Sequence, residues 1–262
     1  MANEVLIRLS VFLSLLVVFA ALEAYAPRRA RALPRLGRWA TNFGMTVLNT
    51  LALRAVAIGV PLLAVGAAVD AAAQGWGLLN MVAWPLWAEV VLAILIFDFA
   101  IWLQHLITHK VPLFWRFHRV HHADRDFDVT TAVRFHPVEI VVSMGVKIAL
   151  VYLIGPAAVA VVLFEIILNG TALFNHANLR LPLALDRAVR LVLVTPDMHR
   201  VHHSVIRAEH DSNYGFALSV WDRIFRTYVA QPEGGHDAMV VGLQWQDDKP
   251  ARLGWSLWLP FR

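Results

Sequence analysis

Eight histidines of this chain stand in three short groups whose spacing suits metal binding. Positions three and four apart lie on one face of a helix, about one turn from each other, so each group can present its imidazoles together. A lone histidine is more often a packed or exposed residue, but three such groups predict a polynuclear metal site. Imidazole nitrogens suit iron, zinc, copper and nickel. The groups are His105 and His109; His118, His121 and His122; and His199, His202 and His203.

The composition indicates a membrane protein. Hydrophobic residues make up 58% of the 262 residues and charged residues only 16%. The net charge of +4 does not indicate a nucleic-acid partner, because the basic residues flank apolar runs, as the positive-inside rule expects. The sequence has no cysteine, which excludes disulfides, thiolate-bound zinc, iron–sulfur clusters and thiolate-bound haem. Any metal must therefore be held by nitrogen and oxygen ligands.

The first apolar run, residues 5–26, is long enough to span a bilayer. A signal peptide is the alternative, because Ala24-Tyr25-Ala26 looks like a cleavage site. The acidic Glu4 and the arginine-rich residues 28–38 that follow the run favour a retained helix. We therefore expect the N-terminus outside and the arginine-rich segment in the cytoplasm.

The second apolar stretch, residues 43–73, is longer than one span requires and contains Arg54. Either residues 42–53 lie along the interface and residues 55–73 span, or Arg54 reaches the interface from a tilted helix. Residues 70–84 contain no Lys or Arg and are expected outside. A third span, residues 86–103, then returns the chain to the side where His105 follows.

Two short apolar segments, residues 138–154 and 157–174, flank a Gly155-Pro156 break. They either span as a hairpin or only dip into the bilayer, and both versions return the chain to the cytoplasm. Residues 181–194 could form an amphipathic surface helix. Trp255, Trp258 and Phe261 of the tail either anchor it to the interface or cap the core. We expect an all-α membrane bundle of about four membrane segments with a cytoplasmic, histidine-rich helical cap.

Two carboxylates lie in apolar surroundings, where an unpartnered charge is unfavourable. They are Asp98, two helical turns before His105 and near the same face, and Glu139. A carboxylate there could accept from the second nitrogen of a metal-bound imidazole and so orient it. Asp98 could instead be a helix-end residue facing water. Other nearby acids are expected to be mostly solvated: Asp124, Asp126, Asp128, Asp197 and Asp211.

The histidine spacing, with its flanking residues, resembles the eight-histidine signature of the fatty acid hydroxylase and sterol desaturase superfamily. The resemblance covers roughly residues 90–228, and its combined motifs are highly specific. Family members commonly have Gly where Arg226 stands. The flanking motifs are T-A-V-R-F-H-P-V-E at 131–139, T-P-D-M-H-R-V-H-H at 195–203, D-S-N-Y-G at 211–215 and W-D-R-I-F-R-T-Y at 221–228.

The resemblance implies that all eight clustered histidines are metal ligands and that His176 is a ninth. It assigns His136 a packing or imidazole-orienting role, and Asp98, Glu139 and Asp211 are candidates for orienting the ligands. His210 and His236 are expected to be ordinary surface histidines. The implied centre holds two iron ions, which zinc can replace on purification, and it uses O2 to hydroxylate or desaturate a C–H bond of a fatty acyl, sterol or alkyl-glycerol lipid.

These features predict three regions: membrane segments in 1–85, a catalytic domain in 86–230 and an interfacial tail in 231–262. The expected location is a membrane, as in a bacterial inner membrane, with the active site on the cytoplasmic side. The sequence contains no G-x-G-x-x-G fingerprint, so electrons must come from a separate reductase, ferredoxin or cytochrome. A histidine-rich metal transporter is the alternative. A b-type cytochrome is a second rival, although adjacent His-His pairs exceed what haem needs.

Overall fold

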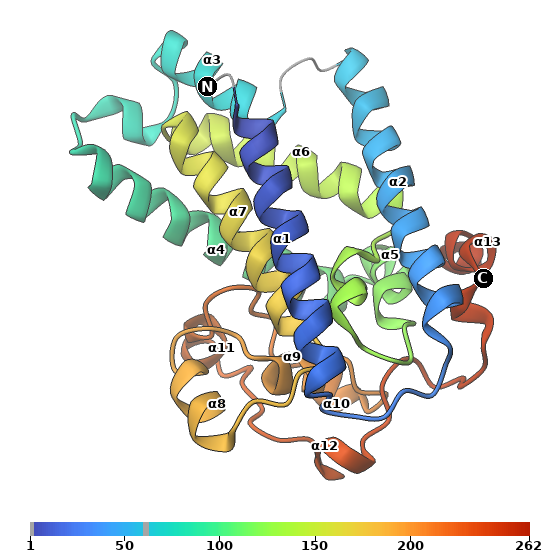
Figure 1. The fold of residues 1–262 in the computed structure, drawn as a ribbon. Helices are drawn as coiled ribbons and strands as arrows, with labels where there is room; N and C mark the ends of the chain where they lie inside the picture. Colours follow the sequence, from blue (N-terminus) through green and yellow to red (C-terminus); the bar gives the residue numbers. More distant parts are fainter. Residues whose placement is uncertain (1–2, 60–62) are drawn as a thin grey trace.

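The computed structural model describes residues 3–59 and 63–262, and this part of the chain is helical without any β-strand. Its long helices lie together in one half of the molecule (Figure 1). Phe97 and Phe164 meet in the core of this half, with ring centroids 5.0 Å apart. The long helices are α1 (Glu4–Tyr25), α2 (Arg35–Gly59), α4 (Leu86–Lys110), α6 (Pro137–Ile154) and α7 (Ala158–His176).

Four of these helices, α1, α4, α6 and α7, are long and apolar enough to cross a membrane. The expected all-α membrane bundle with about four segments is therefore confirmed. Two arrangements are open for Arg54 from the sequence, and in the structure no helix end separates residues 42–53 from Arg54, because α2 begins at Arg35 and continues through the exposed Arg54 to Gly59. A span over 55–73 falls partly outside the described residues. The next helix, α3 (Ala64–Gln74), and α2 are not among the four candidates.

The predicted break between α6 and α7 is present and is made by Gly155. Its φ of +66° ends α6 in the left-handed conformation, which glycine adopts without steric strain. The turn lies directly against the segment before α4. A Cβ atom on Gly77 would lie 2.2 Å from the Gly155 backbone nitrogen, so a side chain there would force the two segments apart.

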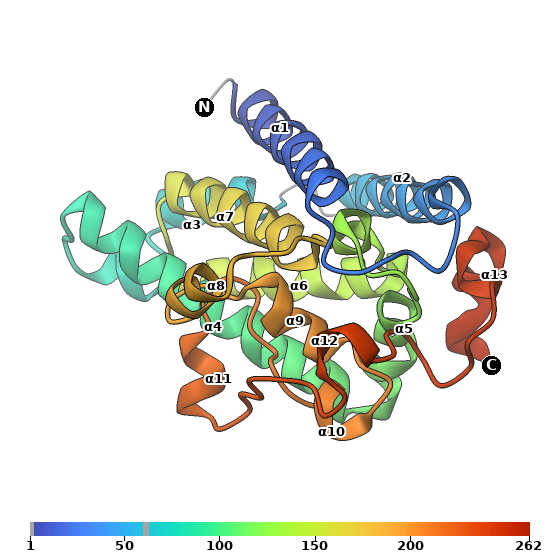
Figure 2. The same cartoon turned by 60° about the horizontal axis from the view of Figure 1, so that its bottom comes forward.

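Short helices form the other half, below the lower ends of α1 and α7 (Figures 1 and 2). The amphipathic helix expected over 181–194 is shorter in the structure, where α8 covers Leu183–Val189. The other helices of this half that matter here are α5 (Pro112–His122), α9 (Pro196–His202), α10 (Arg207–His210), α11 (Val220–Ile224) and α12 (Gly235–Ala238). Short 3-10 turns occur at Leu78–Met81 (η1), Val129–Val133 (η2), Lys249–Ala251 (η3) and Leu259–Phe261 (η4).

The last helix, α13 (Leu253–Trp258), lies against α2 (Figure 1). Trp255 packs on an apolar cluster that includes Met45 and Val120, so this part of the tail covers the core. Trp258 and Phe261 remain largely exposed. Of the two roles considered for the tail aromatics, the structure assigns core packing to Trp255, and interfacial anchoring by Trp258 and Phe261 stays a prediction.

Candidate metal centre

Four helices place the predicted ligands at the junction of the two halves. His105 and His109 occupy the last two turns of α4, and Pro112 starts α5 immediately afterwards because its fixed φ suits the first helical position. His176 ends α7. The third motif lies on α9, whose start is fixed by the Thr195 hydroxyl, which accepts a hydrogen bond from the Met198 amide at 3.3 Å.

All nine predicted histidines come together in two buried groups. In each group the nearest ring nitrogens all lie within 4.8 Å of one another. The five-histidine group consists of His105, His109, His118, His122 and His202, and the four-histidine group consists of His121, His176, His199 and His203.

Hydrogen bonds fix the tautomers of three imidazoles in the five-histidine group. Nδ1 of His105 lies 2.7 Å from the Tyr214 carbonyl oxygen, and Nδ1 of His202 lies 2.6 Å from that of Ser212. Nδ1 of His118 lies 2.6 Å from Glu139 Oε1. Carbonyl and carboxylate oxygens only accept, so each Nδ1 carries the proton and each Nε2 keeps a lone pair. These lone pairs are directed into the group.

The four-histidine group has fewer partners outside itself. His176 donates from Nδ1 to the Ala172 carbonyl at 2.8 Å, and its Nε2 lies 3.1 Å from Nε2 of His121 and 3.2 Å from that of His199. Aromatic rings cover the group, since Phe135 stacks on His121 with centroids 4.5 Å apart and Phe127 lies 4.8 Å from His203. This group is held mainly by packing.

The donor set fits a pair of metal ions. The Nε2 atoms of His105 and His118 lie 3.1 Å apart, yet both tautomers leave lone pairs there, which repel each other unless a cation lies between or beside them. Further buried ring nitrogens have no hydrogen-bond partner, among them both nitrogens of His109 and His203 and Nε2 of His122 and His202. Buried polar atoms are rarely left unsatisfied, and a bound metal would account for one such nitrogen of each ring.

The protonation states also suit metal ligands. Burial, reinforced by neighbouring imidazoles, lowers the pKa of the α5 and α9 histidines well below the usual 6.5: His121, His122, His199, His202 and His203. A metal binds the neutral imidazole, so a ring that is already neutral does not have to lose a proton on binding.

The proposed orienting residues have different positions. Glu139 hydrogen-bonds His118, and Asp211 Oδ1 lies 3.7 Å from His109 Nδ1, while its other oxygen pairs with Lys110 at 2.9 Å. The expectation for Asp98 is wrong, because its carboxylate accepts from the Trp221 indole at 2.8 Å and the Leu218 amide at 3.3 Å. α11 packs on this face of α4, so the Asp98 carboxylate binds the Trp221 indole of α11 instead of an imidazole.

The other three histidines lie outside both groups. His136 caps α6, where its Nδ1 accepts from the Val138 amide at 3.2 Å, and its ring packs on Phe117. His210 is half-buried and stacks on Trp115, with centroids 5.4 Å apart. The expectation that His236 lies on the surface is wrong, because it is buried 3.6 Å from the Asp197 carboxylate.

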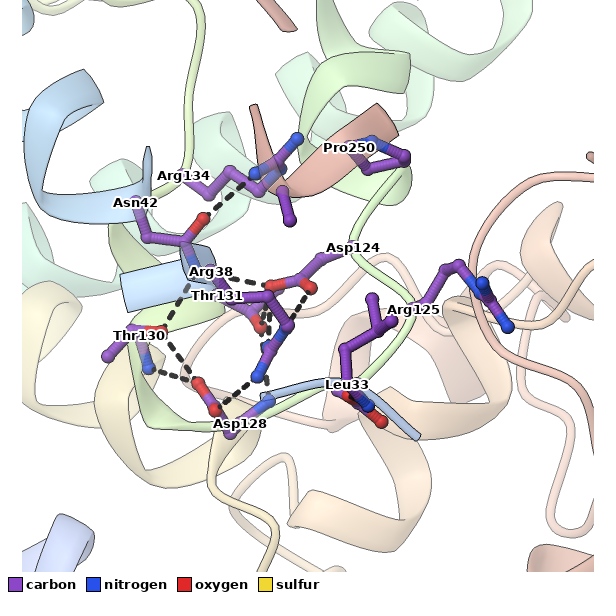
Figure 3. Close-up of polar contacts among 12 residues, drawn as sticks. Leu33, Arg38, Asn42, Asp124, Arg125, Asp128, Thr130, Thr131, Arg134 and Pro250 are labelled. Carbon is purple, nitrogen blue, oxygen red and sulfur yellow. Dashed lines mark hydrogen bonds and ion pairs between the residues drawn. The ribbon is translucent and has the colours of Figure 1, made fainter. Parts of the chain in front are cut away.

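An ion network that the sequence did not reveal holds the segment after α5 (Figure 3). Arg38 of α2 pairs through two nitrogens with Asp124, at 2.7 and 2.9 Å, and through the third with Asp128 at 2.7 Å. All three side chains are buried, so the expectation that the two aspartates are solvated is wrong. Burial alone would raise the pKa of Asp124, but the Arg38 guanidinium lowers it below its ordinary range.

Asp222 organises the loop whose carbonyl orients His105. Its carboxylate accepts from the amides of Tyr214 and Gly215 at 2.9 and 2.8 Å, and from the Trp102 indole at 3.0 Å. The residue stands in the W-D-R motif, so a signal was present in the sequence, but spacing alone does not show what it binds.

Two cavities lead toward the five-histidine group. The inner cavity, of about 350 Å³, is bounded by His105 and His118 and by apolar side chains such as Ile101 and Phe216. The apolar cavity, of about 430 Å³, lies between α4, α5 and α6 and is lined mainly by aliphatic and aromatic side chains. Both are bordered by Gln104, Thr108 and Glu139, so they adjoin. Volumes of this order hold small ligands.

The chain is similar to several known proteins. An ornithine lipid hydroxylase of Rhizobium tropici is 30% identical over 57% of this chain and 44% of its own. An alkylglycerol monooxygenase of Homo sapiens is 32% identical over 52% of this chain and 29% of its own. A cholesterol 25-hydroxylase-like protein of Danio rerio is 30% identical over 59% of each chain.

The matched region spans less than half the length of the first two relatives. No solved structure matches. The family model for fatty acid hydroxylase matches residues 90–227, which contain all nine clustered histidines, most of α4, and all of α5 and α6. On that match, the chain belongs to the fatty acid hydroxylase family.

Proposed function

We propose that this protein is a membrane-bound, O2-dependent oxygenase that hydroxylates or desaturates an unactivated C–H bond of a lipid. The observation that carries this proposal is the inner cavity, whose lining combines apolar side chains such as Ile101 and Phe216 with His105 and His118 of a nine-histidine, two-group centre. The relatives are named as lipid hydroxylases and monooxygenases, which supports the same reaction class.

Two iron ions are the proposed cofactor, with the two histidine groups as their ligand sets. When bound, iron supplies the activation of O2 that oxidation of an unactivated C–H bond requires. The imidazoles of the two groups would hold the two ions. Glu139 and the Tyr214 carbonyl keep the protons on the outer nitrogens of His118 and His105. Nitrogen ligands bind zinc more tightly than ferrous iron, so zinc can replace iron on purification.

The cavity walls position the substrate. Side chains such as Ile101, Met144 and Phe216 would hold an aliphatic chain or ring and keep water from the reacting carbon. Electrons would come from a separate reductase, ferredoxin or cytochrome. The residues that orient the ligands would act indirectly, by keeping each imidazole lone pair aimed into the centre.

The proposed location is a bacterial inner membrane, with the centre on the cytoplasmic side. Arg28 Nε lies 3.3 Å from Asp197 of α9, so the arginine-rich segment after α1 is on the same side as the histidines. Basic segments next to spans favour the cytoplasm. Because the chain lacks cysteine, single cysteines at the exposed Met81 and Gln231 would test this. We expect an impermeant reagent to label only Met81→Cys from outside.

The reaction is tested by comparing lipid extracts of cells that produce the wild type or His202→Ala under 18O2. We expect a lipid in the wild-type extract that differs by one labelled oxygen or by the loss of two hydrogens. Purified protein should contain about two metal ions per chain, given this ligand number. A strong Soret band would indicate haem instead, and extracts without any such lipid would favour a metal transporter.

A further inference from the structure

Three charged side chains of the long helices border the inner cavity. Arg8 belongs to α1, Lys147 to α6 and Glu165 to α7, and all three helices are candidate membrane spans. Lys147 Nζ lies 2.7 Å from Glu165 Oε1, and Arg8 Nη1 lies 3.1 Å from Glu165 Oε2. Ionisable side chains within membrane-spanning helices are energetically unfavourable and usually have a function.

These three side chains, Arg8, Lys147 and Glu165, are called the charged trio, and they lie far from the histidines. Lys147 follows Glu139, the partner of His118, by eight residues along α6, which corresponds to about 12 Å of helix. Glu165 precedes His176 by eleven residues on α7, about 16 Å. The inner cavity therefore has the five-histidine group at one end and the charged trio at the other. The rest of its lining is mixed, with apolar side chains such as Ile101 and polar ones such as Ser143.

The charged trio has unused N–H donors on Arg8 and Lys147, while both carboxylate oxygens of Glu165 are occupied. Each carboxylate oxygen of Glu165 already binds one cation. The Lys147 ammonium has three donors and uses one on Glu165, and the Arg8 guanidinium has five and uses Nη1 on Glu165 and Glu4. The three side chains that line the cavity together carry a charge of +1, which Glu4, paired with Arg8 from outside the lining, balances. Such a surface favours a ligand group that accepts hydrogen bonds and carries negative charge.

We propose that Arg8, Lys147 and Glu165 form a binding site for an anionic group carried on the substrate's aliphatic chain, such as a carboxylate or phosphate. With the anion held there, the carbon presented to the five-histidine group lies far along the chain from the charged end. The carbon oxidised would then be set by the distance between the trio and the histidines. This inference rests on the proposed function for its oxidised end, but its test measures binding alone.

The test uses the purified full chain in nanodiscs of zwitterionic lipid. Equilibrium binding of radiolabelled hexadecanoate and hexadecanol is measured above their partition into protein-free nanodiscs, at a pH where the acid is ionised. We expect the wild type to bind hexadecanoate about tenfold or more tightly than hexadecanol, the difference made by a charged hydrogen bond. Equal binding of the two probes by the wild type would overturn the proposal.

Two substitutions should act in opposite directions. Lys147→Met should abolish the preference for hexadecanoate and leave hexadecanol binding unchanged. Glu165→Gln should strengthen hexadecanoate binding, because it removes the carboxylate partner of Lys147 while Arg8 keeps its pair with Glu4. If the trio were only a clamp between helices, both substitutions would change binding of the two probes alike. Lys147→Arg should keep the preference, and Lys249→Met, at an exposed pair outside both cavities, is the control.

The remaining outcomes also support or contradict the proposed anion site. If Lys147→Met does not fold, the wild-type ratio together with Lys147→Arg and Glu165→Gln still tests the proposal. Displacement of hexadecanoate by inorganic phosphate would mean that the site binds a free anion. That result would overturn the proposal that the anionic group is carried on the aliphatic chain of the substrate. Protein that binds hexadecanoate selectively but takes up no O2 would refute the proposed reaction and leave this site standing.

Discussion

The two histidine groups are built differently. In the five-histidine group, three imidazoles have their outer nitrogens bound to a carboxylate or a backbone carbonyl, and the inner cavity reaches two of its members. In the four-histidine group only His176 has such a partner, the carbonyl of Ala172 on its own helix, and the rings of Phe127 and Phe135 cover the rest.

This difference separates two ways of fixing a ligand. Outer hydrogen bonds set the tautomer and the ring direction one by one, and they raise the basicity of the imidazole. Packing fixes the position of an imidazole through the neighbouring segments, so the ring is held in place only while those segments are stably folded. We therefore expect the five-histidine group to respond to the loss of single polar partners, and the four-histidine group to respond to the loss of the network around residues 124–134.

The largest effect should come from removing one ligand of each group. His118→Ala and His121→Ala should each lower activity by more than roughly a hundredfold, since even the loss of an outer partner can cost 10–100-fold. If the groups hold one ion each, metal content should fall from about two ions per chain to about one in both variants. Metal analysis and product formation measure this, with His236→Ala as the control. Full activity in either ligand variant would contradict the assignment.

The next effect concerns the packing of the four-histidine group. Arg38→Met leaves Asp124 and Asp128 buried without their cation, and breaking a buried pair in this way costs about 3–5 kcal/mol of unfolding free energy. Denaturant or thermal unfolding in detergent measures the loss. Arg252→Met breaks only an exposed pair with Asp248 and should change stability by less than about 1 kcal/mol. Equal stability of the two variants would show that the network does not support the fold.

A smaller effect should single out the five-histidine group. Glu139→Gln keeps a hydrogen-bonding side chain beside His118 Nδ1 but removes its charge, so we expect activity or metal affinity to fall by about 10–100-fold. Titration with iron and product formation measure the change. Glu233→Gln, at an exposed carboxylate, should behave as wild type. An unchanged Glu139→Gln enzyme would mean that packing alone orients His118.

The smallest effect concerns the turn after α11, the helix that carries Asp222. Arg226 has a φ of +57°, in the left-handed region that suits glycine, which gives a physical reason for the family's Gly at this position. Arg226→Gly should relieve a strain of about 1–2 kcal/mol, partly offset by the greater freedom of the unfolded chain, and leave activity unchanged. Arg187→Gly, at an exposed position within α8, should instead destabilise by about 1 kcal/mol. A lower melting temperature for Arg226→Gly would refute the strain.

Much of the centre could be predicted because its chemistry is local in sequence. The His-x2-His-His motifs predicted which imidazoles converge, and the apolar runs predicted α4, α6 and α7 closely. Adjacent positions on a helix point in different directions, so His121 and His122 go to different groups, as do His202 and His203. That division is implicit in the paired histidines, although the spacing alone does not show which group each ring joins.

Other features depend on contacts between distant segments. Arg38 stands in a run of arginines that resembles a solvated basic loop, and its partners lie 86 and 90 residues further along. Asp98 has suitable spacing to His105, but α11, more than 120 residues later, takes its hydrogen bonds. Helical periodicity describes the face on which a side chain lies, while its partner is decided by whichever segment packs on that face.

The contacts between the beginning and the end of the chain also set an order of events during synthesis. Arg28 pairs with Asp237, and the Thr41 hydroxyl donates to the Ala251 carbonyl at 2.6 Å, across 209 and 210 residues. At usual translation rates the early segment waits about 10–40 s for these partners. Phe127, which covers the four-histidine group, packs on Met239 and Val241, so this cover is completed only after those two residues have left the ribosome, and the group stays open to metal until then.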